Sequence, residues 1–245
     1  MRTLKLTLSY DGTRFVGWQR QSEGESIQGL LEDALARFEG GPVSVHGAGR
    51  TDAGVHALGQ VASVRLTCAH DSATLTRALN AQLPEDIRVL AVEEQDDSFH
   101  ARFSARSKTY RYQIRNAPIA SAFERAYVWH IAEPLRLEAM TRAAAQLTGA
   151  HDFAAFRSAG SEVSSTERTV TRSEWRETSG LLTYEISGNG FLRHMVRAIV
   201  GTLVEIGRGW REPEEIAALL EGGTRAQAGA TAPPHGLFLV SVVYD

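Results

Sequence analysis

The stretch best suited to chemistry is rich in glycine and holds one arginine and one aspartate. It reads Gly47-Ala48-Gly49-Arg50-Thr51-Asp52-Ala53-Gly54-Val55-His56. It is not a Walker loop, because no Gly-Lys-Ser/Thr follows, and it is not a dinucleotide fingerprint, because Asp52 stands where the last glycine is needed. Glycines permit tight backbone geometry that could aim the Asp52 carboxylate outward. The alternative is an ordinary turn with a surface pair of Arg50 and Asp52.

A second segment, Phe99 to Tyr112, interleaves basic and aromatic residues. Cations bind phosphates and aromatic rings stack on bases, so this composition is typical of RNA contact. In an alternating strand, Lys108, Tyr110 and Tyr112 share one face, and Arg111 lies on the other. The other interpretation is an amphipathic strand with tyrosines in the core. The window from Phe99 to Val128 holds six basic residues (Arg102, Arg106, Lys108, Arg111, Arg115, Arg125) and one acid, Glu124.

A third candidate is a predicted helix from Phe191 to Ile206. Arg193 and Arg197 stand four residues apart, so they would share one face of this helix. Two like charges repel there unless an anion or a carboxylate lies nearby. The alternative is a solvated edge of the helix.

The histidines show no metal-ligand spacing on a helix, which leaves one possible metal site, formed by His46, Asp52 and His56. The single cysteine, Cys68, is expected to be a small buried residue.

The composition is that of an ordinary folded protein. The chain has 245 residues, 43% of them hydrophobic, and a net charge of −3. This size allows one large domain or two small ones. One cysteine cannot form an internal disulfide, so a reduced, cytoplasmic protein is expected. No signal peptide is predicted, because Met1-Arg2-Thr3-Leu4-Lys5-Leu6 alternates and lacks an apolar block. No membrane helix is predicted, because the most apolar long stretch, Phe191 to Ile206, is interrupted by charged residues.

The hydrophobic periodicity predicts the same order of elements twice. The first half reads strand Leu4–Tyr10, helix from the N-cap Ser26 to Gly40, strands Val43–Gly47 and Leu58–Leu66, helix from the N-cap Ser72 to Gln82, and strand Ile87–Val92. The second half reads strand Ala105–Arg115, helix Leu135–Leu147 ended by Gly149, strands Thr166–Arg176 and Leu181–Ser187 joined at Ser179-Gly180, helix Phe191–Ile206, short helix Pro213–Leu220 and strand Leu237–Tyr244.

This order predicts an α+β fold of two ferredoxin-like (β-α-β-β-α-β) halves. The N-terminal lobe, residues 1–104, would carry the Asp52 loop, and residues 105–245 would form the C-terminal lobe. The simplest assembly joins the two antiparallel sheets side by side, with a central active-site cleft near their junction. Such sheets commonly serve as RNA platforms.

Several stretches, taken in order, resemble one known family. They are Tyr10-Asp11-Gly12, Gly17-Trp18-Gln19-Arg20-Gln21, Ser26-Ile27-Gln28, Gly49 to Ala57, Ser98 to Ala105, Tyr110-Arg111-Tyr112, His151-Asp152-Phe153, Phe191-Leu192, Met195-Val196-Arg197 and Gly236-Leu237-Phe238-Leu239. Their order and spacing resemble the tRNA pseudouridine synthase A family nearly end to end. Arg193 and His235 depart from the family pattern, which affects only details of RNA contact.

The resemblance implies an isomerase that converts uridine to pseudouridine at positions 38, 39 and 40 of the tRNA anticodon stem-loop. Asp52 would be the catalytic nucleophile. The substrate-binding residues would be Tyr110, Arg50, Arg197 and Leu237, with Arg197 pairing with Asp52 and Leu237 excluding water. Further RNA contacts would come from Arg102, Arg106, Lys108, Arg111 and Arg193. The resemblance further implies tRNA as the partner, a homodimer, a cytoplasmic location, and neither metal nor cofactor.

Three alternatives remain at this stage. A non-catalytic RNA-binding module would account for the basic aromatic segment but not for the Asp52 loop. A metal-dependent hydrolase would use His46, Asp52 and His56. A different pseudouridine synthase family would differ only in its RNA target.

Overall fold

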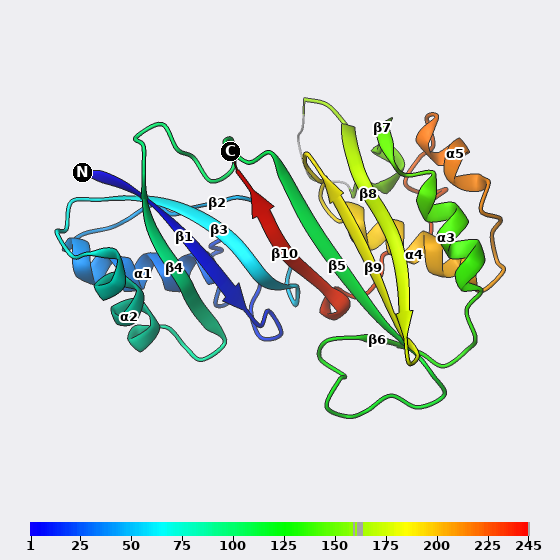
Figure 1. The fold of residues 1–245 in the computed structure, drawn as a ribbon, viewed down its shortest axis with the longest axis horizontal. Helices are drawn as coiled ribbons and strands as arrows, with labels where there is room; N and C mark the ends of the chain where they lie inside the picture. Colours follow the sequence, from blue (N-terminus) through cyan, green and yellow to red (C-terminus); the bar gives the residue numbers. More distant parts are fainter. Residues whose placement is uncertain (159, 161–163, 245) are drawn as a thin grey trace. The chain divides into compact units, whose positions relative to one another are not determined.

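The chain forms two compact units. The computed structural model describes residues 1–158, 160 and 164–244 (Figure 1). One unit comprises Met1–Arg106 and Phe238–Asp245, and the other comprises Ser107–Leu237. The last strand, β10 (Leu237–Val243), therefore lies mostly with the first unit, whereas the sequence pattern assigned it to the C-terminal lobe. The reason is long-range pairing, because Phe238 and Leu239 pair in parallel with His56 and Ala57.

The first unit is built on an antiparallel sheet to which β10 adds in parallel. β1 (Arg2–Tyr10) lies between β3 (His56–Leu66) and β4 (Ile87–Gln95), giving the order β4-β1-β3-β10. The short β2 (His46–Gly47) pairs antiparallel with β3. The predicted alternation in β1 is confirmed, since Leu4, Leu6 and Leu8 are all buried.

Two helices pack on this sheet, and their ends follow from local chemistry. α1 (Ile27–Glu39) begins at the predicted N-cap, where the Ser26 side chain accepts a hydrogen bond from the Gly29 N–H, and it ends at Gly40 in the left-handed conformation (φ 76°). α2 (Ser72–Gln82) packs on α1 and β4. Its N-cap is Asp71 and not Ser72, because the Asp71 carboxylate accepts from the Thr74 N–H.

The second unit repeats the combination of a sheet with helices. Its antiparallel strands follow the order β5 (Ser107–Asn116), β9 (Leu181–Gly188), β8 (Glu167–Thr178) and β7 (Gly149–Asp152). The short β6 (Trp129–Ile131) pairs in parallel with β5. The helices are α3 (Leu137–Ala145), α4 (Met195–Gly207) and α5 (Glu215–Leu220), with 3-10 turns at Ala154–Phe156 and Pro234–Gly236.

Two predictions about this unit are wrong. α4 begins at Met195 and not at Phe191, because His194 adopts a left-handed conformation (φ 61°) that cannot continue a helix backward. Arg193 therefore precedes the helix and does not share a helical face with Arg197. α3 ends at Ala145, and Gly149 (φ 123°) instead begins β7.

Among the residues that the structure describes, no helix combines the length and the apolar character that a bilayer crossing requires.

Candidate active site

Asp52 lies in the first unit, in the loop that joins β2 to β3, and its side chain is half-buried. Immediately after it the chain turns tightly, because the Val55 N–H donates to the Asp52 carbonyl at 3.1 Å. Gly54 makes this turn possible with a left-handed backbone (φ 77°). The turn directs the chain from the Asp52 position into β3.

A neighbouring segment, Asp11 to Trp18, holds this loop from the other side. The Trp18 N–H donates to the Thr51 carbonyl at 3.0 Å, and Gly17 forms an isolated antiparallel bridge with Asp52. Gly17 has φ 107°, and a Cβ there would lie 2.6 Å from the Thr51 carbonyl oxygen. A Cβ at Gly12 would overlap the Val55 carbonyl oxygen. Only glycine fits where these two backbones meet.

Three buried polar side chains support the loop from beneath. The Tyr10 hydroxyl lies 2.8 Å from Thr51 Oγ1, and Gln60 Nε2 lies 3.3 Å from the same hydroxyl. Gln60 Nε2 also donates to the Gly49 carbonyl at 2.9 Å. Burial raises the pKa of Tyr10 to about 12, so the hydroxyl keeps its proton at neutral pH. These contacts preorganise the backbone on both sides of Arg50 and Asp52.

The sequence patterns assign no role to Tyr10, Thr51 or Gln60, although Thr51 lies in the glycine-rich stretch and Tyr10 ends the first predicted strand. Gln60 could have been found from the sequence as a polar residue at a buried position of the strand β3.

His56 is a structural histidine. It is 1% exposed, its Nδ1 accepts from the Gly12 N–H at 3.0 Å, and its ring stacks on Phe238 with centroids 4.7 Å apart. Among the residues that the structure describes, no three His, Cys, Asp or Glu side chains are grouped to hold a metal ion. The described part of the chain therefore offers no ligand cluster for the metal-dependent alternative.

The other predicted residues of the first unit are basic and exposed. Arg50 stands on the surface of the Asp52 loop. Arg102 places its guanidinium 5.5 Å from the ring centroid of Phe103. The Arg106 side chain is exposed, and its backbone N–H donates to the Val243 carbonyl.

Tyr110 and Arg197 are held firmly within the second unit. Tyr110 is buried on β5 and meets Phe191 edge to face, with centroids 5.0 Å apart. Arg197 Nε donates to the Ala232 carbonyl at 2.8 Å, and the Ala232 N–H donates back to the Arg197 carbonyl at 3.0 Å. This reciprocal pair ties α4 to the segment that leads to Leu237, which is also buried.

The remaining predicted RNA contacts of this unit differ in their surroundings. Arg111 donates two hydrogen bonds to Glu185 Oε1, at 3.0 and 2.7 Å, so its charge already has an acidic partner. Lys108 is half-buried on β5. Arg193 is exposed, and its carbonyl accepts from the Ser158 N–H.

The structure thus brings Arg50 and Asp52 together in one unit, and Tyr110, Arg197 and Leu237 in the other. The pairing of Arg197 with Asp52 stays a prediction.

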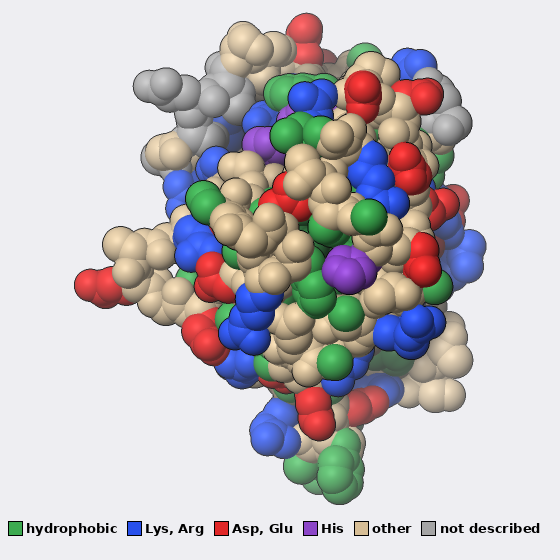
Figure 2. Space-filling model, turned by 90° about the vertical axis from the view of Figure 1, so that its left-hand side faces the viewer, with side chains coloured by type: hydrophobic (Ala, Val, Ile, Leu, Met, Phe, Trp, Pro, Cys, Tyr) green, Lys and Arg blue, Asp and Glu red, His purple; other side chains and the backbone are tan. Residues whose placement is uncertain are grey.

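The surface charge is mixed. Figure 2 shows one face of the molecule, on which acidic and basic side chains are interspersed. Two arginines of the first unit are paired with carboxylates: Arg20 contacts Glu32 and Asp33, and Arg14 contacts Glu25 and Asp86. Such exposed pairs add little stability and leave little net positive potential.

The fold and this loop define a mixed α+β protein that presents one aspartate from a rigid, glycine-rich turn. The family model described as tRNA pseudouridine synthase matches residues 7–104 and 143–245. Over 244 residues the chain is 46% identical to tRNA pseudouridine synthase A of Syntrophotalea carbinolica, covering 100% of this chain and 97% of the relative. It is 43% identical to the protein of that name from Thermoanaerobacter sp. (strain X514), covering 100% of both. With the protein of that name from Geobacter sulfurreducens the identity is 46%, covering 99% of each chain.

The chain belongs to the tRNA pseudouridine synthase family.

Proposed function

We propose that this protein isomerises uridine to pseudouridine at positions 38, 39 and 40 of the tRNA anticodon stem-loop, with Asp52 as the catalytic nucleophile. The observation that carries the proposal is the loop around Asp52. Its backbone is braced by Gly17, Trp18 and the buried hydroxyl of Tyr10, although the carboxylate itself is only half-buried. A loop backbone that is braced in this way holds the carboxylate it carries in a defined position.

The reaction requires little beyond one well-placed carboxylate. The N1–C1′ bond of uridine breaks and a C5–C1′ bond forms, while C5 loses a proton and N1 gains one. No electrons are transferred and no water is consumed. A carboxylate acts as a nucleophile at a glycosidic carbon in retaining glycosidases, which is the chemistry assigned here to Asp52.

Other residues would prepare the substrate for this step. The target base must leave the stem before it can reach a carboxylate. Arg50, exposed beside Asp52, would hold the space that the base vacates. Tyr110 would stack on the base or donate a hydrogen bond to it, and Arg197 would keep Asp52 ionised by offering an opposite charge.

A second group of residues would shield the intermediate and bind the RNA. Leu237 would exclude water that could hydrolyse the intermediate. Arg102, Arg106, Lys108, Arg111 and Arg193 would contact the RNA.

The proposal extends to the architecture. Two ferredoxin-like halves, residues 1–104 and 105–245, would join their sheets around a central active-site cleft. The order β4-β1-β3 with β2 on β3 supports this description of the first half. A cytoplasmic location is proposed because the tRNA substrate is found there.

We also propose a homodimer. Ile119 and Phe123 are large exposed apolar residues in the segment between β5 and β6, and such residues are typical of protein interfaces. Light scattering on the purified protein would test this, and a monomer at micromolar concentration would contradict it.

The test uses tRNA transcripts with uridine at positions 38 to 40 and no added metal or nucleotide. Carbodiimide-block primer extension should give stops at those positions with the wild-type protein and none with Asp52→Asn. The variant should still bind tRNA within a few fold of wild type. Asp33→Asn, an exposed carboxylate on α1, is the matched control and should retain turnover.

Lost tRNA binding by a folded Asp52→Asn protein, or stops that persist with it, would contradict the role of Asp52. Tight tRNA binding by the wild type without stops would point to another RNA target or to the non-catalytic alternative.

A further inference from the structure

A column of rings stands on the surface of the first unit, outside the loop that carries Asp52. The imidazoles of His46 and His100 stack with centroids 5.0 Å apart and planes at 28°. Phe103 follows with its ring centroid 4.5 Å from that of His100, and the Arg102 guanidinium lies 5.5 Å from the Phe103 centroid. Phe103 is 75% exposed, so one face of its ring is open to a binding partner.

The turn that presents Phe103 is firmly built. The Ser104 N–H donates to the His100 carbonyl at 2.9 Å, and the His100 N–H donates to Ser104 Oγ at 3.1 Å. Between them, the Ala101 N–H donates to Ser63 Oγ at 3.0 Å, which anchors the turn to β3. The Tyr244 hydroxyl donates to the Ala101 carbonyl at 2.7 Å. The exposed ring therefore sits on a preorganised support, and binding to it would cost little ordering entropy.

His100 is an uncharged part of this column. Its Nδ1 accepts from the Arg102 N–H at 3.1 Å, which requires that nitrogen to be unprotonated. Burial, together with the nearby His46, lowers the pKa of His100. A neutral imidazole stacks on Phe103 without adding a second charge beside Arg102.

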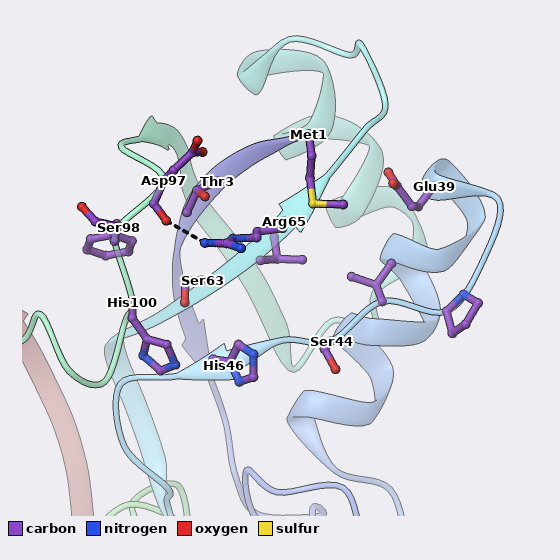
Figure 3. A pocket seen from close by; sticks show the side chains of 14 residues that line it. Met1, Thr3, Glu39, Ser44, His46, Ser63, Arg65, Asp97, Ser98 and His100 are labelled. Carbon is purple, nitrogen blue, oxygen red and sulfur yellow. Dashed lines mark hydrogen bonds between the residues drawn. The ribbon is translucent and has the colours of Figure 1, made fainter.

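His46 and His100 also line a groove whose other residues have a different character. Figure 3 shows His46 and His100 side by side in its wall, with Arg65 reaching across to the Asp97 carbonyl. The groove measures about 550 Å³, and it is lined by the carboxylates Glu39 and Asp97 as well as by Arg65. This mixed charge gives an anion no net attraction. The ring column, by contrast, ends in a cation and carries no carboxylate between His100 and Arg106.

We propose that Phe103, His100 and Arg102 form a stacking platform for an unpaired base of the tRNA. Single-stranded nucleic acids bind where aromatic faces lie beside cations, because every base has a flat face and every nucleotide a phosphate. The Phe103 ring has a guanidinium and an imidazole beside it, which is the combination that a stacked base and its phosphate require. The column also begins at His46, four residues before Arg50, so the same chain segment leads from the platform into the Asp52 loop.

This inference rests on the proposed function, and its test separates the two. Wild-type protein is first assayed for pseudouridine formation in tRNA. Kd, KM and kcat are then measured for Phe103→Ala, Phe103→Leu and Phe103→Tyr. Leu90→Ala on β4, which removes an apolar side chain that is 54% exposed, is the control for loss of surface hydrophobicity.

Loss of one stacked base corresponds to roughly a 5- to 140-fold weaker binding, from about 1–3 kcal/mol per base. We expect a change of this size in Kd and KM for the alanine and leucine variants, near wild-type values for the tyrosine variant, and no change for Leu90→Ala. If the wild type forms pseudouridine but Phe103→Ala and Phe103→Leu bind tRNA as it does, the platform is wrong and the proposed function stands. If the wild type forms none, the proposed function is what fails.

A cross-linking experiment then identifies what touches residue 103. A photoreactive benzoylphenylalanine placed there should cross-link to tRNA at an unpaired nucleotide, mapped by primer extension. A cross-link to a second copy of the chain instead, or none to tRNA under turnover conditions, would overturn the platform.

Discussion

Replacing Gly17 by alanine should slow catalysis by displacing Asp52 without removing any functional group. A Cβ at residue 17 would lie 2.6 Å from the Thr51 carbonyl oxygen and 3.0 Å from the Asp52 carbonyl carbon. Cβ contacts under 3.0 Å essentially do not occur, so the two backbones must separate by at least about 0.4 Å. A misplacement of about 1 Å can cost about 100-fold in rate, so a shift of about 0.4 Å should lower kcat by roughly sixfold or more.

The matched control is Gly40→Ala. Gly40 also has a positive φ, 76°, but nothing lies within 4 Å of a Cβ built there. Gly40→Ala carries a backbone cost of about 1–2 kcal/mol for a side chain in the left-handed region, and Gly17→Ala, at φ 107°, carries at least as much. For a chain of this size that cost corresponds to a fall in Tm of roughly 2–8 °C. Only Gly17→Ala also strains the loop that carries Asp52.

Turnover can be followed with tRNA that carries tritium at uridine C5, since the new glycosidic bond displaces that hydrogen into solvent. Thermal melting of both variants shows how much stability each has lost. Equal kcat values for Gly17→Ala, Gly40→Ala and the wild type, measured below every Tm, would refute the reasoning that Gly17 sets the position of Asp52.

Three further predictions concern Tyr110, the basic residues and Tyr10. Tyr110→Phe should retain more activity than Tyr110→Ala, because the ring that packs on Phe191 is kept; equal losses in kcat would assign the hydroxyl the main role. Arg102→Gln should weaken tRNA binding and lower the slope of log Kd against log salt concentration by about one. Arg111→Gln should change this slope less, because Glu185 already pairs with the Arg111 charge. Filter binding across a salt series checks this, and equal slopes for the two variants or a larger change for Arg111→Gln would contradict it. Burial raises the pKa of Tyr10 from 10.0 to about 12. The neutral Tyr10 hydroxyl therefore contributes fully to the free energy of unfolding below pH 10. This contribution, up to ~3 kcal/mol, is lost between about pH 10 and 12. Urea unfolding from pH 9 to 11 should therefore show a shallower decline for Tyr10→Phe than for the wild type, and parallel declines would contradict this.

Local patterns in the sequence predicted much of the secondary structure. The alternation of Leu4, Leu6 and Leu8 placed β1, and Ser26 and Gly40 marked the ends of α1, because strand faces and helix caps depend on residues only a few positions apart. The glycine-rich stretch around Asp52 also stood out by composition alone. The local signal failed at α4, where Phe191 continues the apolar pattern but His194 breaks the helical backbone.

The family, the Asp52 loop and the order of the elements follow from the amino-acid sequence. The contacts that hold the Asp52 loop become visible only in the folded structure. The Tyr10 side chain reaches Thr51, 41 residues away in the sequence, and the Gln60 side chain reaches the Gly49 carbonyl, 11 residues away. Gly17 forms an isolated β-bridge with Asp52, and Phe238 joins the first unit through parallel pairing with His56. Such contacts depend on strand register and burial, which arise only when distant segments of the chain pack together.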